Sequence, residues 1–145
     1  VIGGAPGAGK TTWVTNLGHE WALHGVPVAY VAGDEAREGI LIRLGQQAGI
    51  DRKYLEEGAP VALDDLEKHL QELPMLLVDP DEDVGVDVAT VATALRRRWP
   101  VEGPAVIIID SLQAMARRIP DDVSDTPRAK VDAFADGIAE ASIAR

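Results

Sequence analysis

The chain has 145 residues and a net charge of −10, with 46% apolar and 26% charged residues. These values are typical of a folded globular protein and exclude wholesale disorder. No apolar run approaches the roughly 18 residues of a membrane span. The absence of cysteine excludes disulfides, cysteine–zinc sites and thiol catalysis. The acidic balance argues against nucleic-acid binding by the surface as a whole, because such binding depends on neutralising phosphates.

The first half of the chain alternates strand and helix patterns around a glycine-rich segment. Residues 1–2 are interpreted as the tail of a first strand, since only two apolar residues precede that segment. Residues 10–24 have the apolar spacing of a helix. A strand at residues 27–32 and a helix at residues 38–48 follow.

The second half continues the same alternation. In chain order it predicts a helix at residues 63–73, a strand at 75–78, a helix at 86–99, a strand at 105–110, a loop at 119–127 and a helix at 131–145. Strands alternating with helices are typical of an α/β fold with a parallel sheet. We interpret residues 1–145 as one domain truncated at both ends, because the pattern begins inside a strand and stops inside a helix. No basic segment followed by an apolar stretch opens the sequence, and we expect a cytoplasmic protein with no membrane contact.

The glycine-rich segment matches the phosphate-loop pattern G-x-x-x-x-G-K-[ST] in full. Glycines allow backbone N–H groups to surround phosphate oxygens, and the following helix directs its positive end at the same anion. Lys10 is expected to reach the β- and γ-phosphates of ATP, and the Thr11 hydroxyl to coordinate Mg²⁺. The residues expected to bind the nucleotide are Gly4, Ala5, Pro6, Gly7, Ala8, Gly9, Lys10, Thr11 and Thr12.

Acidic residues follow two of the predicted strands. Asp110 ends an apolar strand, which is the Walker B pattern for a carboxylate that holds Mg²⁺ directly or through water. Asp34 and Glu35 follow the strand at residues 27–32, where an acid can orient and deprotonate an attacking water. The alternative is a solvated acidic turn before the next helix. The pattern does not decide which acid acts, although Glu35 has the longer reach.

With these motifs in order, the chain resembles the RecA-like P-loop ATPases, in particular the branch of DnaB-type replicative helicases, RepA-like plasmid helicases and RadA-like repair ATPases. Four stretches carry the resemblance. They are GGAPGAGKTT at residues 3–12, VAYVAGDEAREGILIRL at 28–44, LPMLLVDP at 73–80 and VIIIDSLQAM at 106–115. The resemblance implies a three-layer P-loop NTPase with a RecA-like core and a mostly parallel sheet.

The resemblance also implies a function. In that family the acid after the second strand is the catalytic base, and an arginine follows on the next helix, as Arg43 does here. The spacing from Arg43 places the family's glutamate at Asp34, so either Asp34 acts with a shorter reach, Glu35 substitutes, or hydrolysis is slow. The implied protein is an ATP-hydrolysing motor, a helicase or a recombination and repair ATPase, in a homo-oligomeric ring or filament. Residues 117–130, with Arg117 and Arg118, would contact single-stranded DNA.

Two other functions remain open at this stage. A nucleotide or small-molecule kinase has a similar phosphate loop, although no basic lid segment is apparent and the acidic charge disfavours anionic acceptors. Such an enzyme would transfer phosphate to its acceptor faster than to water. A non-hydrolysing, ATP-dependent switch or assembly protein would bind ATP tightly, and replacing both acids by their amides would leave its turnover unchanged.

Overall fold

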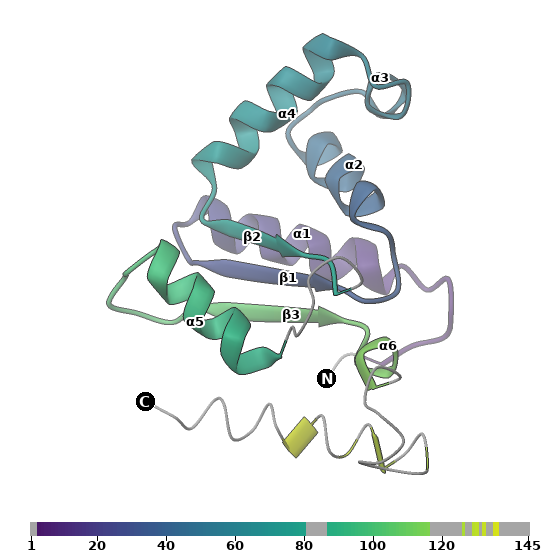
Figure 1. Cartoon of the computed structure of the whole chain (residues 1–145). Coiled ribbons are helices and arrows are strands. Elements are labelled where there is room, and N and C mark those ends of the chain that lie inside the picture. Colours follow the sequence, from purple (N-terminus) through teal and green to yellow (C-terminus); the bar gives the residue numbers. More distant parts are fainter. Residues whose placement is uncertain are drawn as a thin grey trace.

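The computed structural model describes residues 3–80, 87–116, 126, 129–130, 132 and 135–136. Short helices and strands alternate along this part of the chain (Figure 1). In order they are α1 (Lys10–Leu23), β1 (Val28–Ala32), α2 (Arg37–Gln47), α3 (Arg52–Glu56), α4 (Pro60–Glu72), β2 (Met75–Val78), α5 (Val88–Arg98), β3 (Val106–Asp110) and α6 (Leu112–Ala116).

The three described strands form one parallel sheet in the order β2-β1-β3. Val28 at the start of β1 pairs with Met75 on one side and Val106 on the other. All five residues of β1 are buried, as expected for a central strand covered on both faces. The predicted α/β class with a parallel sheet is therefore confirmed.

Alternate residues of β1 point into two separate apolar layers. Ala29 and Val31 pack with Val91 and Leu95 of α5. Tyr30 and Ala32 pack toward α1 and α2, in a second cluster that contains Ile40 and Leu44. Helices α1 and α5 thus cover opposite faces of the sheet, which gives three layers (Figure 1). The layer of α1 and α2 matters for the site, because α1 follows the glycine-rich loop directly and its Thr15 contacts Tyr30 of β1.

Two short helices were not expected from the sequence. Helix α3 has five residues, too few for an apolar period, and its start is fixed by the Asp51 side chain, which accepts a hydrogen bond from the Lys53 amide at 2.8 Å. Helix α6 follows β3 directly and is equally short. Helix α4 begins at Pro60, three residues before the predicted start, since proline suits the first helical turn.

Some predicted elements lie outside the described residues. These are the strand tail at residues 1–2, most of the loop at 119–127 and most of the helix at 131–145. Within the described part, none of the helices has the length and apolar character that crossing a membrane requires.

A pair of histidines joins α1 to α4. The Nε2 atoms of His19 and His69 lie 2.7 Å apart, and His19 is only 6% exposed. One of these nitrogens must donate and the other accept, so the contact requires at least one neutral ring. Burial lowers the pKa of His19, the neighbouring His69 lowers it further, and Glu20 opposes the shift.

This pair predicts a loss of stability at mildly acidic pH. Because the pKa of His19 in the folded protein lies below its ordinary value of 6.5, the unfolded chain binds more protons at and below that pH. The stabilisation that neutral His19 gives the folded protein is therefore complete above pH 6.5, and it is lost as the pH falls toward the lowered pKa of His19. Urea unfolding of the protein between pH 7.5 and 5.5 should show a falling midpoint, with a weaker fall in His19→Gln. The matched control is His24→Gln, just after the same helix, where the ring is exposed. An unchanged pH dependence in His19→Gln would contradict the assignment.

Candidate functional site

The glycine-rich loop wraps around the side chain of its own lysine. Gly7 and Gly9 both have φ of 77°, in the left-handed region where glycine is strongly favoured. The Lys10 ammonium donates to the carbonyl oxygens of Gly4 and Ala5, each at 2.9 Å. Backbone oxygens thus hold the cation at the mouth of the loop, in reach of an anion that enters it.

The first turn of α1 presents its positive end to the same space. Gly9 caps the helix without a side-chain hydrogen bond, and no acidic residue lies in the first turn. The leading N–H groups of a helix have no intrahelical acceptors and favour a bound anion. Together with Lys10, these groups form an arrangement suited to phosphate oxygens.

The carboxyl ends of β1 and β3 meet beside this loop. Ala32 pairs with Asp110, and the carbonyl oxygen of Asp110 accepts hydrogen bonds from the amides of Gly33 at 2.5 Å and Asp34 at 3.1 Å. These bonds fix the segment after β1 against the end of β3. The acids that the sequence singled out after the two strands, Asp34, Glu35 and Asp110, therefore lie at one edge of the sheet.

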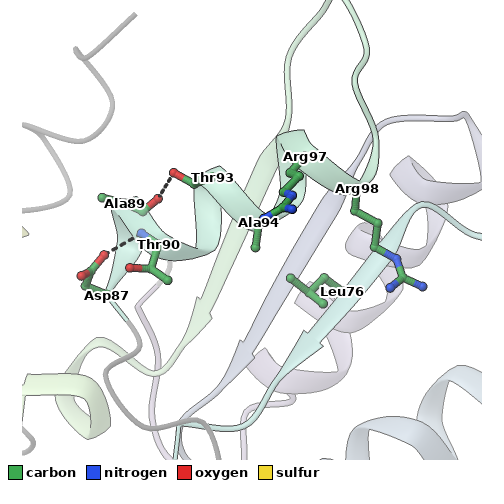
Figure 2. A pocket seen from close by; sticks show the side chains of 8 residues that line it. All are labelled: Leu76, Asp87, Ala89, Thr90, Thr93, Ala94, Arg97 and Arg98. Carbon is green, nitrogen blue, oxygen red and sulfur yellow. Dashed lines mark hydrogen bonds between the residues drawn. The ribbon is translucent and has the colours of Figure 1, made fainter.

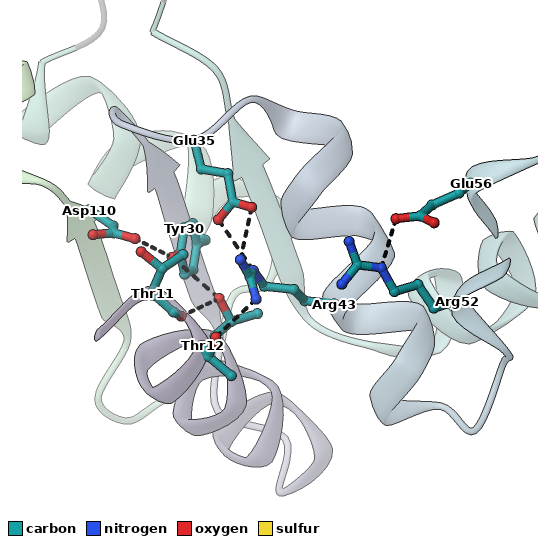
Figure 3. A network of polar contacts seen from close by, with 9 residues as sticks. Thr11, Thr12, Tyr30, Glu35, Arg43, Arg52, Glu56 and Asp110 are labelled. Carbon is teal, nitrogen blue, oxygen red and sulfur yellow. Dashed lines mark hydrogen bonds and ion pairs between the residues drawn. The ribbon is translucent and has the colours of Figure 1, made fainter. Parts of the chain in front are cut away.

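Glu35 is held by an arginine. Arg43 of α2 donates through Nε to Glu35 Oε2 at 3.2 Å and through Nη2 to Oε1 at 3.0 Å. Its remaining Nη1 donates to Thr12 Oγ1 at 2.9 Å (Figure 3). Both side chains are about 30% exposed, with 31% for Arg43 and 29% for Glu35. This two-pronged contact ties α2, the segment after β1 and the start of α1 together, and it occupies both carboxylate oxygens of Glu35.

Asp34 has a different environment from its neighbour. The residue is exposed, and only its backbone amide is fixed, by the Asp110 carbonyl. Among the described residues, no hydrogen bond or ion pair engages its carboxylate. Of the two adjacent acids, Asp34 therefore has the carboxylate that is free to approach a ligand.

Asp110 has its own support in a buried tyrosine. The Tyr30 hydroxyl donates to Asp110 Oδ2 at 2.9 Å and lies 3.3 Å from Thr15 Oγ1. Thr15 in turn donates to the Thr11 carbonyl at 2.7 Å. Burial raises the pKa of Tyr30 well above its ordinary value of 10, with a further rise from the Asp110 charge, so the hydroxyl stays protonated.

The roles of Tyr30 and Thr15 were not expected from the sequence. Two signals were present: a tyrosine inside an otherwise apolar strand, whose hydroxyl needs a partner when buried, and a threonine one helical turn after Thr11. Neither signal identifies the partner without the packing of α1 against β1.

The donor set at this edge suits a small divalent cation. A hydroxyl from Thr11 and a carboxylate from Asp110 are the hard oxygen ligands that Mg²⁺ prefers, and Mg²⁺ usually completes its shell with water and phosphate oxygens. The bonds through Thr15 and Tyr30 link the Thr11 backbone to the Asp110 carboxylate. The residues present therefore fit the cation that the phosphate-loop motif implies.

A separate hollow lies on the other side of the sheet, between α5 and the edge strand β2 (Figure 2). It includes Arg97 and Arg98, near the end of α5, where cations favour the negative end of the helix dipole. It shares no residue with the phosphate loop. Its lining residues are Leu76, Asp87, Ala89, Thr90, Thr93, Ala94, Arg97 and Arg98.

The predicted DNA contacts are not tested by this geometry. Arg117 and Arg118 lie outside the described residues. Lys130, in the same predicted loop, is described and half-buried.

Comparison with known proteins places this chain in a family. A family model described as an AAA domain matches residues 1–142. The comparison with curated proteins gave no significant match. Among solved structures, one described as an ATPase domain aligns with a TM-score of 0.68 and 17% identity, covering 94% of this chain and 49% of that one. A DnaB-like replicative helicase, studied for its interactions with primase, aligns with a TM-score of 0.66 and 17% identity, covering 94% of this chain and 33% of that one.

The chain thus spans about half of one of these structures and a third of the other. The likeness confirms the fold that the sequence resemblance implied, a RecA-like core of the DnaB type. The chain belongs to the family of AAA domains and has the fold of the ATPase domains of DnaB-like helicases.

Proposed function

We propose that this chain is the ATP-binding and ATP-hydrolysing motor domain of a protein that acts on DNA. One observation carries the proposal. The start of α1, directly after the phosphate loop, is linked through Thr15 and Tyr30 to Asp110 at the carboxyl end of β3. The amide of Asp34, just after β1, binds the Asp110 carbonyl at the same edge of the sheet. Parallel α/β sheets bind their ligands at this edge. Membership of the AAA-domain family supports the same interpretation.

The phosphate loop and the residues at this edge of the sheet each have a proposed role in ATP hydrolysis. Lys10 exchanges its contacts with Gly4 and Ala5 for the β- and γ-phosphates of ATP. Thr11 and Asp110 hold Mg²⁺, which when bound neutralises charge on the phosphate oxygens. The N–H groups of the loop surround the phosphates as far as Thr12.

Asp34 is proposed as the acid that orients and deprotonates the attacking water. Its carboxylate is exposed and has no described partner, whereas both oxygens of Glu35 accept from Arg43. A base must be free to accept a proton from water. The geometry thus favours Asp34, the position that the spacing from Arg43 indicates. Glu35 and Arg43 instead brace the loop through Thr12.

Action on DNA rests on the matched structures. One is an ATPase domain and the other is a DnaB-like replicative helicase. By analogy with the helicase we propose single-stranded DNA as a partner and a homo-oligomeric ring, with Arg117 and Arg118 as DNA contacts. The family match and these structures favour a motor over the nucleotide-kinase alternative.

Removing the phosphate-loop lysine should abolish ATP hydrolysis. We expect Lys10→Ala to lower steady-state phosphate release by at least about a hundredfold, because preorganised charge at the phosphates is lost. The matched control is Lys53→Ala, where the exposed ammonium lies on α3, and it should retain the wild-type rate. Hydrolysis retained by Lys10→Ala would contradict the proposal.

Single-stranded DNA should stimulate hydrolysis in a salt-dependent manner. Protein–phosphate contacts release counterions, so the stimulation should fade between about 50 mM and 200 mM salt. Arg117→Ala/Arg118→Ala should reduce the stimulation while leaving DNA-independent turnover unchanged. Turnover that is indifferent to DNA at both salt concentrations would contradict a DNA-coupled motor and favour the kinase or switch alternatives.

A further inference from the structure

A chain of buried hydroxyl groups connects the two proposed magnesium ligands. It runs from the Thr11 carbonyl to Thr15 Oγ1 at 2.7 Å, from there to the Tyr30 hydroxyl at 3.3 Å, and on to Asp110 Oδ2 at 2.9 Å. Thr15 and Tyr30 are each 0% exposed. The two hydroxyl groups that connect α1 through β1 to β3 are therefore shielded from solvent, whereas Thr11 and Asp110 at the two ends are half-buried.

The direction of each hydrogen bond follows from the number of protons. Tyr30 has one hydroxyl proton, and it is donated to the carboxylate of Asp110. Thr15 also has one proton, which lies mainly toward the nearer Thr11 carbonyl and is shared with the Tyr30 oxygen. The arrangement fixes Asp110 Oδ2, while Oδ1 has no hydrogen-bond partner among the described residues.

The backbone places Tyr30 for this contact. Tyr30 and Ala32 lie on the same face of β1, and Ala32 is the register partner of Asp110. The tyrosine therefore reaches Asp110 from two residues back along the neighbouring strand. A phenylalanine would fill the same space in the core but would leave the carboxylate without its donor.

We propose that Tyr30 and Thr15 are positioning residues that hold the Asp110 carboxylate in one orientation relative to Thr11, so that Oδ1 is presented to the nucleotide-bound cation. The inference rests on the proposed function. Groups that orient a metal ligand commonly set the affinity of the metal. Tyr30→Phe should therefore weaken cation binding in the nucleotide complex while leaving cation-free nucleotide binding intact.

The experiment measures cation and nucleotide separately in the intact protein. Mn²⁺ is titrated into the protein saturated with ATPγS, and free Mn²⁺ is followed by electron paramagnetic resonance. Affinity for mant-ATP is measured in EDTA. For Tyr30→Phe we expect Mn²⁺ affinity to fall about tenfold or more and mant-ATP affinity in EDTA to stay at the wild-type value. Tyr54→Phe is the matched control, because this tyrosine is 54% exposed on α3, and it should match wild type in both assays.

A second variant keeps the test decisive. Thr15→Val removes the other hydroxyl of the chain and should weaken Mn²⁺ binding in the same direction; it decides the matter if Tyr30→Phe does not fold. If the folded variants bind Mn²⁺ with wild-type affinity, the positioning role is overturned but the proposed function is not. An equal loss of mant-ATP binding in EDTA would show a merely structural role and also overturn it. Failure of the wild-type protein to bind mant-ATP would instead overturn the proposed function.

Discussion

The parallel pairing of β1 with β3 is the constraint on which the rest of the site depends. It sets Ala32 opposite Asp110 and brings the amides of Gly33 and Asp34 onto the Asp110 carbonyl. The approach leaves little room, because a Cβ on Gly33 would lie 3.1 Å from the Cβ of Ala114 and 3.2 Å from the Asp110 oxygen. Glycine at this position thus lets two acidic segments share one edge of the sheet.

The helix that carries the phosphate loop is held to the same sheet by close packing. A Cβ on Gly18 of α1 would lie 2.7 Å from the Cδ1 of Ile108, so a larger residue at this position would require the Ile108 side chain of β3 to move. Thr15, one turn nearer the loop, then reaches Tyr30. The contacts that pack α1 on the sheet therefore also orient the groups that are proposed to face a bound nucleotide.

Much of this arrangement could be predicted from the sequence, for identifiable reasons. The phosphate loop is a local pattern with fixed spacing, and the apolar strand before Asp110 is equally local, so both were located from residue order alone. Contacts between distant residues could not be located in this way. Tyr30 and Asp110 are eighty positions apart in the sequence. The two-bond ion pair between Arg43 and Glu35 depends on the residue at which α2 begins. Helix α3 escaped prediction because five residues show no helical period.

The adjacent acids Asp34 and Glu35 differ in the partners of their carboxylates. Sequence spacing left both as candidates, and reach alone favoured Glu35. The structure engages Glu35 with Arg43 and leaves the Asp34 carboxylate without a described partner. Under the proposed function, Glu35, which is paired with a guanidinium, braces the segment after β1, whereas the exposed Asp34 meets the attacking water molecule.

The most direct test of this account is single-turnover ATP hydrolysis by Asp34→Asn and Glu35→Gln, with ATP affinity measured in parallel. The account predicts that Asp34→Asn lowers the rate by about a hundredfold or more with ATP affinity retained, because the proton acceptor is lost. Glu35→Gln should keep the larger part of the rate and instead lower thermal stability, because its charged pairing with Arg43 is weakened. The reverse pattern, with hydrolysis lost in Glu35→Gln and kept in Asp34→Asn, would contradict the assignment.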